Sequence, residues 1–333
     1  MGQRHIPAVS ITVVKDGALM RTGAYGTADL ENDIPARPNT VFKIGSVSKQ
    51  FISAGIMILV QDRQMGLDDK ISKYIEGSPD TWKDITVRHV LTHTSGLVRE
   101  GPGFDAHRIQ PDIEVIQSAF ALALQWKPGD KYAYSNLGYY VLAEIIRQVS
   151  GKAWEVFLKE RVFDPLGMTS TRATSVTEIV LNRARGYVWN ADRFANAEDW
   201  TARRPSGAFL STAQDMAKWE VALQMDRILT PASKEAMWTP VRLNDGKTYP
   251  YGFAWELDDF PPGGYATGVP MVRHEGAIAG FRAAFGKLPK QGIGIIVLSN
   301  LDRAALDSIV AGIAVHYVPE LLPAARNRWP AMK

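Results

Sequence analysis

The sequence predicts an α/β (α+β) fold in which an antiparallel sheet, built from both ends of the chain and flanked by helices, carries a large helical insertion. Segments rich in β-forming residues lie near both ends of the chain, and apolar residues recur at helical spacing between them. A length of 333 residues suits two lobes, or one domain with a large insertion. We expect a sheet lobe from residues 1–62 and 246–333, a mostly helical lobe from residues 63–245, and an active site in the cleft between them.

The first predicted elements are a pair of strands and a buried helix. Residues 8–14 and 18–25 favour strands, and the "KDG" between them is a hairpin turn signal. After a loop at residues 35–40, residues 46–61 are apolar almost all the way round the helical wheel. A helix of this kind is buried rather than half exposed.

The middle of the chain predicts helices separated by turns. The stretch "ITVRHVLTHTSGL" indicates a short helix that ends at Gly96, and "LSTAQDMAKWEVAL" indicates a helix with a Ser/Thr cap. An amphipathic helix is predicted over residues 137–149, with Gly151 as its stop, and another helix is predicted from Lys152 onward.

Beyond about Asp245 the pattern changes to strands. The stretches "YPYGFAWELDD", "MVRHEGAIAG", "FRAAFGKLP" and "GIGIIVLSN" alternate or run apolar between Gly and Pro residues. They predict successive antiparallel strands. A final helix is predicted over residues 303–317.

Composition narrows the classes of function. The 38 basic residues are scattered among 35 acidic ones, so we expect no nucleic-acid partner. The absence of cysteine excludes disulfides, thiolate catalysis and cysteine-ligated metals. The longest apolar run, residues 52–60, is too short to span a bilayer, and no signal peptide is visible. The sequence as written predicts a cytoplasmic protein, or a periplasmic or secreted one if a leader has been removed. It leaves the oligomeric state open.

The first motif with chemical meaning is "SVSK". Ser46 and Lys49 lie one helical turn apart on the same face of the predicted buried helix. A serine hydroxyl is a poor nucleophile until a base takes its proton, and burial lowers the pKa of a lysine so that it can act as that base. The alternative is a serine helix cap followed by a surface lysine.

Two further motifs provide partners for this pair. In "YSN", Tyr134 can pass a proton and Asn136 can donate to a substrate carbonyl, although a core tyrosine and a helix cap would have the same sequence. In "HEG", His274 and Gly276 lie on a predicted strand, where a glycine often marks the close approach of another backbone or of a ligand. The alternative is a structural histidine.

In this order, the three motifs resemble those of the serine β-lactamase-related hydrolases of the class C type. That group includes class C β-lactamases, D-Ala-D-Ala carboxypeptidases, D-aminopeptidases and β-lactamase-like carboxylesterases. Stretches such as "GLDDKISKYI", "LTHTSGL", "KPGDKYAYSNLGYYVLAEII" and "GIGIIVLSN" extend the similarity from about residue 8 to about residue 317.

The resemblance implies a role for each motif residue. Ser46 would attack a carbonyl and carry the acyl group, while Lys49 and Tyr134 would accept and return its proton. Asn136 would steady the acyl carbonyl. The remaining assignments concern the third motif: the backbone N–H of Ala277, just past Gly276, would complete an oxyanion hole with that of Ser46, and His274 would stand where many relatives have lysine.

The third motif also departs from the family pattern. Glu275 and Ala277 stand where relatives often have hydroxyl residues, which disfavours a substrate carboxylate. We therefore expect an esterase or amidase for small neutral or amine-bearing acyl substrates. The alternatives are a D-aminopeptidase in which Glu275 binds an ammonium group, a β-lactamase or DD-carboxypeptidase, a penicillin-binding module that is acylated without turnover, and a scaffold without activity.

The partner is expected to be a small ester, amide or lactam, with no cofactor and no metal. His89 and His93 have the spacing of metal ligands on a helix, but the sequence offers no obvious third ligand. The loop at residues 100–110, which contains His107, is expected to border the cleft. An aromatic surround is expected from four residues: Trp126, Tyr132, Tyr251 and Phe281.

Overall fold

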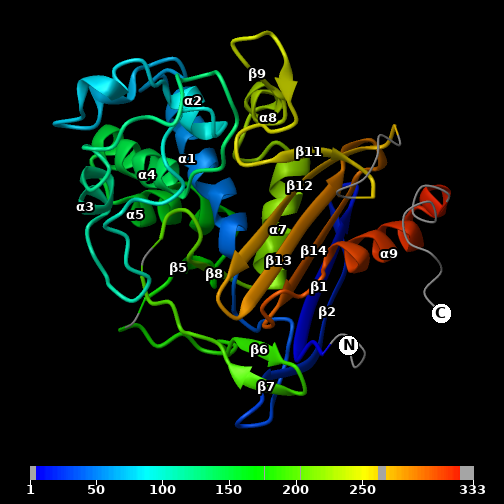
Figure 1. The fold of residues 1–333 in the computed structure, drawn as a ribbon. Helices are drawn as coiled ribbons and strands as arrows, with labels where there is room; N and C mark the ends of the chain where they lie inside the picture. Colours follow the sequence, from blue (N-terminus) through cyan, green and yellow to red (C-terminus); the bar gives the residue numbers. More distant parts are fainter. Residues whose placement is uncertain (1–4, 176, 203, 262–267, 323–333) are drawn as a thin grey trace.

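The computed structural model describes residues 5–175, 177–202, 204–261 and 268–322. Its largest element is one seven-stranded antiparallel sheet to which both ends of the chain contribute (Figure 1). This architecture confirms the predicted fold class. In spatial order, the strands are β11 (Glu256–Asp259), β12 (Pro270–Ile278), β13 (Phe281–Leu288), β14 (Ile293–Ser299), β1 (Ala8–Lys15), β2 (Ala18–Asp29) and β3 (Ile34–Pro35).

Strand β14 shows how the sheet is held between two apolar layers. Its side chains alternate between the two faces of the sheet, as in any strand. Ile295 and Val297 belong to the core on the side of the C-terminal helix α9 (Asp307–Tyr317), whereas Ile296 and Leu298 belong to the main core on the other side. Both faces are covered, and every residue of β14 is accordingly buried.

The remaining helices lie on the face of the sheet opposite α9 (Figure 1). Helix α1 (Lys49–Gln61) packs against α4 (Asn136–Ser150), and α7 (Ala213–Gln224) packs on β1 and β14. The shorter helices are α2 (Val87–Leu91), α3 (Asp112–Gln117), α5 (Trp154–Leu158), α6 (Asp164–Leu166) and α8 (Pro231–Met237). Among the described residues, no helix has the length and apolar character that a membrane crossing requires.

A small three-stranded sheet fixes the entrance to α1. It has the order β4 (Phe42–Lys43), β8 (Phe209–Ser211) and β5 (Arg172–Ala173), and the Ile44 N–H donates to the Phe209 carbonyl oxygen at 3.0 Å. This pairing holds the chain just before Ser46 beside the chain that follows Ser206. The other short pairs are β6 (Tyr187–Asn190) with β7 (Arg193–Asn196), and β9 (Val241–Arg242) with β10 (Thr248–Tyr249).

Several predicted elements differ from the structure. The helix expected to end at Gly96 ends at Leu91, because His93 has a left-handed backbone with φ of 58°. The last helix begins at Asp307 rather than at residue 303. The stretch "YPYGFAWELDD" is not one strand: Tyr249 ends β10, the last four residues form β11, and Ala254 between them has a positive φ of 65°. The hairpin β6–β7 has no counterpart in the sequence prediction.

Candidate active site

Ser46 lies in a 3₁₀ turn, Gly45–Ser48, that leads directly into α1. The Ser48 hydroxyl donates to the Gly45 carbonyl oxygen at 2.6 Å and accepts from the Phe209 N–H at 3.2 Å. These bonds tie the turn to itself and to β8. Ser46 therefore stands on a fixed turn, is half-buried, and makes no helix-capping bond.

Lys49 is completely buried, so the surface-lysine alternative is wrong. Its Nζ lies 3.1 Å from Ser46 Oγ, 2.7 Å from Asn136 Oδ1 and 2.6 Å from the Ser206 carbonyl oxygen. Burial, reinforced by the nearby Arg204 guanidinium, lowers the pKa of Lys49 well below its usual value. The amine is thus placed to take the Ser46 proton.

The Tyr134 hydroxyl is hydrogen-bonded to the Ser46 side chain. Burial raises the pKa of Tyr134 above its usual value, although a hydrogen bond with Ser46 acts in the opposite direction. The resting side chain is therefore a neutral phenol, and the nearby cations do not make it a phenolate. Lys49 Nζ lies 4.7 Å from the centre of the tyrosine ring, and the Arg99 guanidinium carbon lies 5.2 Å from it.

Asn136 is free to serve the site because a neighbour caps its helix. The Ser135 hydroxyl accepts from the Gly138 N–H at 3.0 Å and so provides the N-cap of α4. The Asn136 amide NH₂ donates to Glu100, while its oxygen accepts from Lys49. The helix-cap alternative for Asn136 is wrong.

Gly276 allows β12 to pack closely against the turn that carries Ser46. A Cβ at this position would lie 2.0 Å from the Ile44 carbonyl oxygen, and a Cβ on Gly45 would lie 2.4 Å from the Ala277 nitrogen. Only glycine leaves space for two backbones at this distance. The Ala277 N–H consequently lies next to the turn that carries Ser46.

His274 is a buried, neutral imidazole. Burial, with the Lys49 charge beside it, lowers the pKa of His274 to about 3. Its Nδ1 donates to the Glu275 carbonyl oxygen at 2.6 Å, because a carbonyl can only accept, so Nε2 is left to accept from the Tyr251 hydroxyl at 3.1 Å. The His274 side chain therefore contributes two hydrogen bonds to the site and no positive charge.

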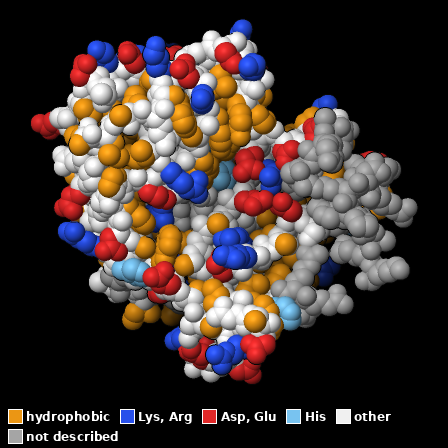
Figure 2. Space-filling view, viewed as in Figure 1, with side chains coloured by type: hydrophobic (Ala, Val, Ile, Leu, Met, Phe, Trp, Pro, Cys, Tyr) orange, Lys and Arg blue, Asp and Glu red, His pale blue; other side chains and the backbone are white. Residues whose placement is uncertain are grey.

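These residues surround a cavity of about 360 Å³. Figure 2 shows side chains of both charges around the hollow between the helices and the sheet. The lining consists of Ser46, Arg99, Glu100, Tyr134, Asn136, Trp200, Arg204, Ser206, Gly207, Glu256, His274, Glu275, Ala277 and Ile278.

Carboxylates gather around the Arg273 guanidinium at one side of this cavity. Arg273 lies 2.7 Å from Glu275, 2.8 Å from Glu256, 3.3 Å from Asp258 and 3.5 Å from Asp307. Four carboxylates thus share one guanidinium, and two of them, Glu256 and Glu275, line the cavity. Burial raises the pKa of Asp307 to about 7, so this group is not fully ionised at neutral pH. The pKa of Glu256 is raised by burial.

The structure brings most of the predicted site residues together. Lys49 lies directly beneath Ser46, while Gly276 provides the close backbone contact. The other five predicted residues line the cavity: Ser46, Tyr134, Asn136, His274 and Ala277.

Sequence reasoning missed one group of site residues and misplaced another. Arg204 forms an ion pair with Glu100 at 3.0 Å, and Trp200 lines the cavity. The only sequence signal near them is "GAFLSTAQDMAKW", which begins just after Ser206. The expected aromatic surround is wrong, since none of the four predicted residues is among the lining residues: Trp126, Tyr132, Tyr251 and Phe281.

The two histidines considered as metal ligands have other partners. His89 Nδ1 accepts from the Thr86 N–H at 3.2 Å in a capping box, and His93 Nδ1 accepts from the Ser135 N–H at 3.1 Å. His107 pairs with Glu198 at 2.7 Å, which ties the predicted border loop to the segment that carries Trp200.

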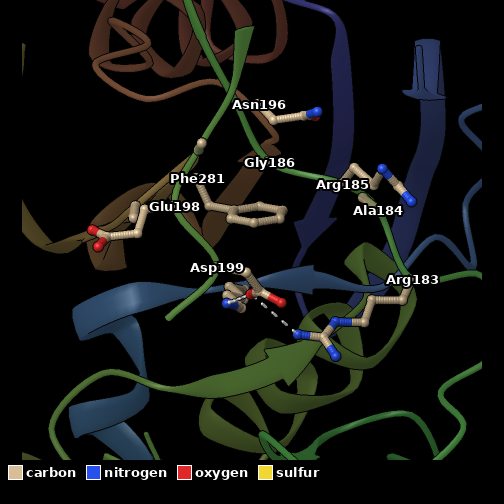
Figure 3. Close-up of a pocket in the computed structure, with 11 residues that line it drawn as sticks. Arg183, Ala184, Arg185, Gly186, Asn196, Glu198, Asp199 and Phe281 are labelled. Carbon is tan, nitrogen blue, oxygen red and sulfur yellow. Dashed lines mark hydrogen bonds and ion pairs between the residues drawn. The ribbon is translucent and has the colours of Figure 1, made fainter. Parts of the chain in front are cut away.

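Phe281 lines a second cavity of about 530 Å³ next to the first (Figure 3). In this cavity, the buried Lys43 donates to Asp199 at 2.5 Å and to the Trp200 carbonyl oxygen at 2.8 Å, and Arg183 lies 3.7 Å from Asp199. The chain at residues 199–200 therefore separates the two cavities, with Asp199 on one side and Trp200 on the other.

Comparison with known proteins identifies the family. The family model described as Beta-lactamase matches residues 1–317. The chain belongs to the beta-lactamase family. This family is one of serine hydrolases, in agreement with the resemblance found in the motifs.

Related proteins of the beta-lactamase family carry several names. Penicillin-binding protein 4* of Bacillus subtilis (strain 168) is 28% identical over 91% of this chain and 70% of its own length. The unguisins hydrolase ungD' of Aspergillus campestris is 28% identical over 94% of this chain and 61% of its own length. The chain thus spans between about three fifths and seven tenths of the length of these curated relatives.

Solved structures share the fold. A structure described as the octameric penicillin-binding protein homologue from Pyrococcus abyssi has a TM-score of 0.82 and 27% identity, covering 99% of this chain and 77% of that one. The D-amino acid amidase from Ochrobactrum anthropi SV3 has a TM-score of 0.79 and 25% identity, covering 98% and 96%.

Proposed function

We propose that the protein is a serine hydrolase that forms an acyl-enzyme on Ser46 and acts on small ester or amide substrates. The site lies in a cleft between a sheet lobe, residues 1–62 and 246–333, and a helical lobe, residues 63–245. The observation that carries the proposal is the buried Lys49 Nζ at 3.1 Å from Ser46 Oγ. An amine with a depressed pKa is a base at neutral pH, and a serine needs such a base to attack a carbonyl.

Acylation would use the three proton carriers in turn. Lys49 takes the Ser46 proton as Oγ bonds to the carbonyl carbon, and the resulting oxyanion accepts from the N–H groups of Ser46 and Ala277. The bond to the leaving group then breaks as the Tyr134 phenol gives that group its proton. The Lys49 ammonium returns a proton to Tyr134, so the site is again neutral around an acylated serine. Deacylation repeats these transfers with water in place of the serine.

The wall of carboxylates supports an acyl group that bears an amine. Glu256 and Glu275 line the cavity, and a single guanidinium, that of Arg273, pairs with both. An ammonium group would gain from this field, whereas the carboxylate of a penicillin would be repelled. The structural similarity to a D-amino acid amidase agrees with this choice.

The test is a substrate panel on the purified protein. D- and L-alanine p-nitroanilide, p-nitrophenyl butyrate and nitrocefin are compared for the parent, Ser46→Ala and Glu275→Gln. We expect Ser46→Ala to lose every activity. Glu275→Gln should raise KM for the amine-bearing substrate by about tenfold, the effect of about 1.4 kcal/mol, with little change for the butyrate ester.

A matched control is Glu76→Gln, which removes an exposed carboxylate outside the cavity and should leave the panel unchanged. Full activity in Ser46→Ala would refute the serine mechanism. Nitrocefin as the best substrate would refute the amine preference while leaving the mechanism standing.

A second candidate is a penicillin-binding module that is acylated on Ser46 and deacylates slowly, because a relative is named penicillin-binding protein 4*. Mass spectrometry after exposure to benzylpenicillin separates the two. A persistent adduct that is absent in Ser46→Ala would favour the module, and released product with free protein would favour turnover.

A further inference from the structure

The His93 ring packs against the Tyr134 ring, and His93 has no part in the proton transfers above. It follows α2, it is 1% exposed, and its backbone has a φ of 58°. This left-handed conformation is uncommon for residues other than glycine, although asparagine, aspartate and histidine adopt it more often than the rest. A buried histidine held in this conformation beside a proposed catalytic group calls for a physical reason.

Two hydrogen bonds link His93 to both neighbours of Tyr134. The Ala133 N–H donates to the His93 carbonyl oxygen at 2.8 Å, and the Ser135 N–H donates to His93 Nδ1 at 3.1 Å. The chain on either side of Tyr134 is therefore fixed to a single residue. Both bonds depend on the backbone twist at His93, because it presents the carbonyl and the imidazole to the same segment.

The rings are also in contact. The centre of the His93 imidazole lies 4.3 Å from that of the Tyr134 phenol, with the planes tilted by 36°. Lys49 and Arg99 approach the same phenol ring at 4.7 Å and 5.2 Å. The packing of the His93 ring against the phenol ring thus restricts the movement of Tyr134.

The protonation state of His93 follows from these contacts. Because Nδ1 accepts from a backbone N–H, the ring proton is on Nε2. Nε2 is buried without a hydrogen-bond partner among the described residues. Burial, with Lys49 as the nearest cation, lowers the pKa of His93 well below its usual value, so the acceptor at Nδ1 is retained.

We propose that His93 is a positioning residue that holds the Tyr134 phenol in register with Ser46 through the Ser135 N–H···Nδ1 bond and the ring contact. This inference rests on the proposed function. Misplacement of a reacting group by about 1 Å costs on the order of 10²-fold in rate, so loss of this support should appear in kcat rather than in KM.

The experiment compares His93→Asn with His93→Gln. Asparagine places its amide oxygen where Nδ1 lies and tolerates the left-handed backbone, whereas the glutamine amide lies one bond further out, near Nε2. With the substrate that the panel identifies, we expect His93→Gln to lower kcat by about 10- to 100-fold with KM nearly unchanged. His93→Asn should keep kcat within about threefold of the parent.

A double-mutant cycle asks whether His93 acts through Tyr134. In a Tyr134→Phe background, His93→Gln should lower the residual kcat by less than about twofold, because the group that it positions is gone. The control is His89→Gln, four residues away in the same segment. A glutamine there can still accept from the Thr86 N–H, so activity should not change.

Three results would overturn the proposal. They are a parental kcat in His93→Gln, equal losses in the Asn and Gln variants at equal thermal stability, and an undiminished effect of His93→Gln in the Tyr134→Phe background. If circular dichroism shows that His93→Gln is unfolded, His93→Asn alone tests the proposal. A kcat of His93→Asn below about a tenth of the parental value then refutes it. If Ser46→Ala is inactive but the His93 variants keep the parental kcat, only this inference is refuted. If Ser46→Ala is active, the proposed function itself is refuted.

Discussion

Among the residues that the structure describes, three lysines are buried, and they differ in what their side-chain nitrogens contact. Lys43 lies 2.5 Å from Asp199, and Lys287 lies 3.1 Å from Glu220. Lys49 contacts a hydroxyl, an amide oxygen and a backbone carbonyl, and no ion pair within the described part of the chain includes it.

Burial lowers the pKa of all three lysines, but the carboxylates beside Lys43 and Lys287 act in the opposite direction. A carboxylate favours the charged amine, whereas neutral acceptors leave desolvation largely uncompensated. The charge of the partner, rather than depth alone, therefore separates a lysine that joins structural elements from one that can act as a base.

The two paired lysines each join distant parts of the fold. Lys43 holds the wall at residues 199–200 between the two cavities. Lys287 joins β13 to α7 through Glu220, which packs so closely on β14 that a Cβ at Gly294 would lie 2.5 Å from its side chain. These pairs provide the sharpest contrast with Lys49.

The largest expected effect comes from Lys49→Met. Removal of the only proposed base for Ser46 should lower kcat/KM by about 10³-fold or more. Methionine fills a similar volume without a buried amine, so thermal unfolding should show a folded protein. Steady-state hydrolysis of the best panel substrate measures kcat/KM, and circular dichroism follows the thermal unfolding. Activity within tenfold of the parent would mean that another group is the base.

Lys287→Met should have the opposite pattern. It leaves Glu220 as an unpaired buried charge, which costs about 3–5 kcal/mol of unfolding free energy. The double variant Lys287→Met/Glu220→Leu should recover most of that stability, because a buried ion pair and an apolar pair are often equivalent. Urea unfolding measures both. If Lys287→Met instead lowered kcat strongly and left the stability unchanged, Lys287 and Lys49 would not differ in role as proposed.

The smallest effect is a shift of the pH profile by Asn136→Asp, which gives Lys49 a carboxylate partner like that of Lys287. A nearby anion stabilises the ammonium and raises the pKa of Lys49, so the free amine forms only at higher pH. The acid limb of the kcat/KM profile should therefore move to higher pH. At a pH below this limb, activity should fall about tenfold for a shift of about one pH unit. An acid limb at the parental pH would show that Lys49 is not the titrating base.

Much of the site follows from local sequence because its motifs lie on regular elements. "SVSK" precedes a buried helix, "YSN" starts α4 and "HEG" lies in β12, so the type of element was predictable in each case. Arg204, Trp200 and Glu100 lie on loops without a periodic pattern. Their positions depend on contacts between segments far apart in sequence, which no local pattern encodes.

The protonation states were even less accessible to sequence. Burial raises the pKa of Tyr134 and keeps the phenol neutral, although the Arg99 guanidinium acts in the opposite direction. His274 stands where many relatives have a lysine, yet it carries no charge because it is enclosed. Burial is a sum over the whole fold, so it is decided only when distant segments pack.

By itself, the sequence determined the fold class, the family resemblance and the choice of Ser46 as the proposed nucleophile, because period, turn chemistry and short motifs are local properties of the chain. The tertiary structure decided which buried lysine has only neutral partners, where the carboxylates gather, and that the His93 ring packs against Tyr134. These depend on desolvation and on distances between residues remote in sequence, and both arise only when the sheet from the two chain ends closes on the helices.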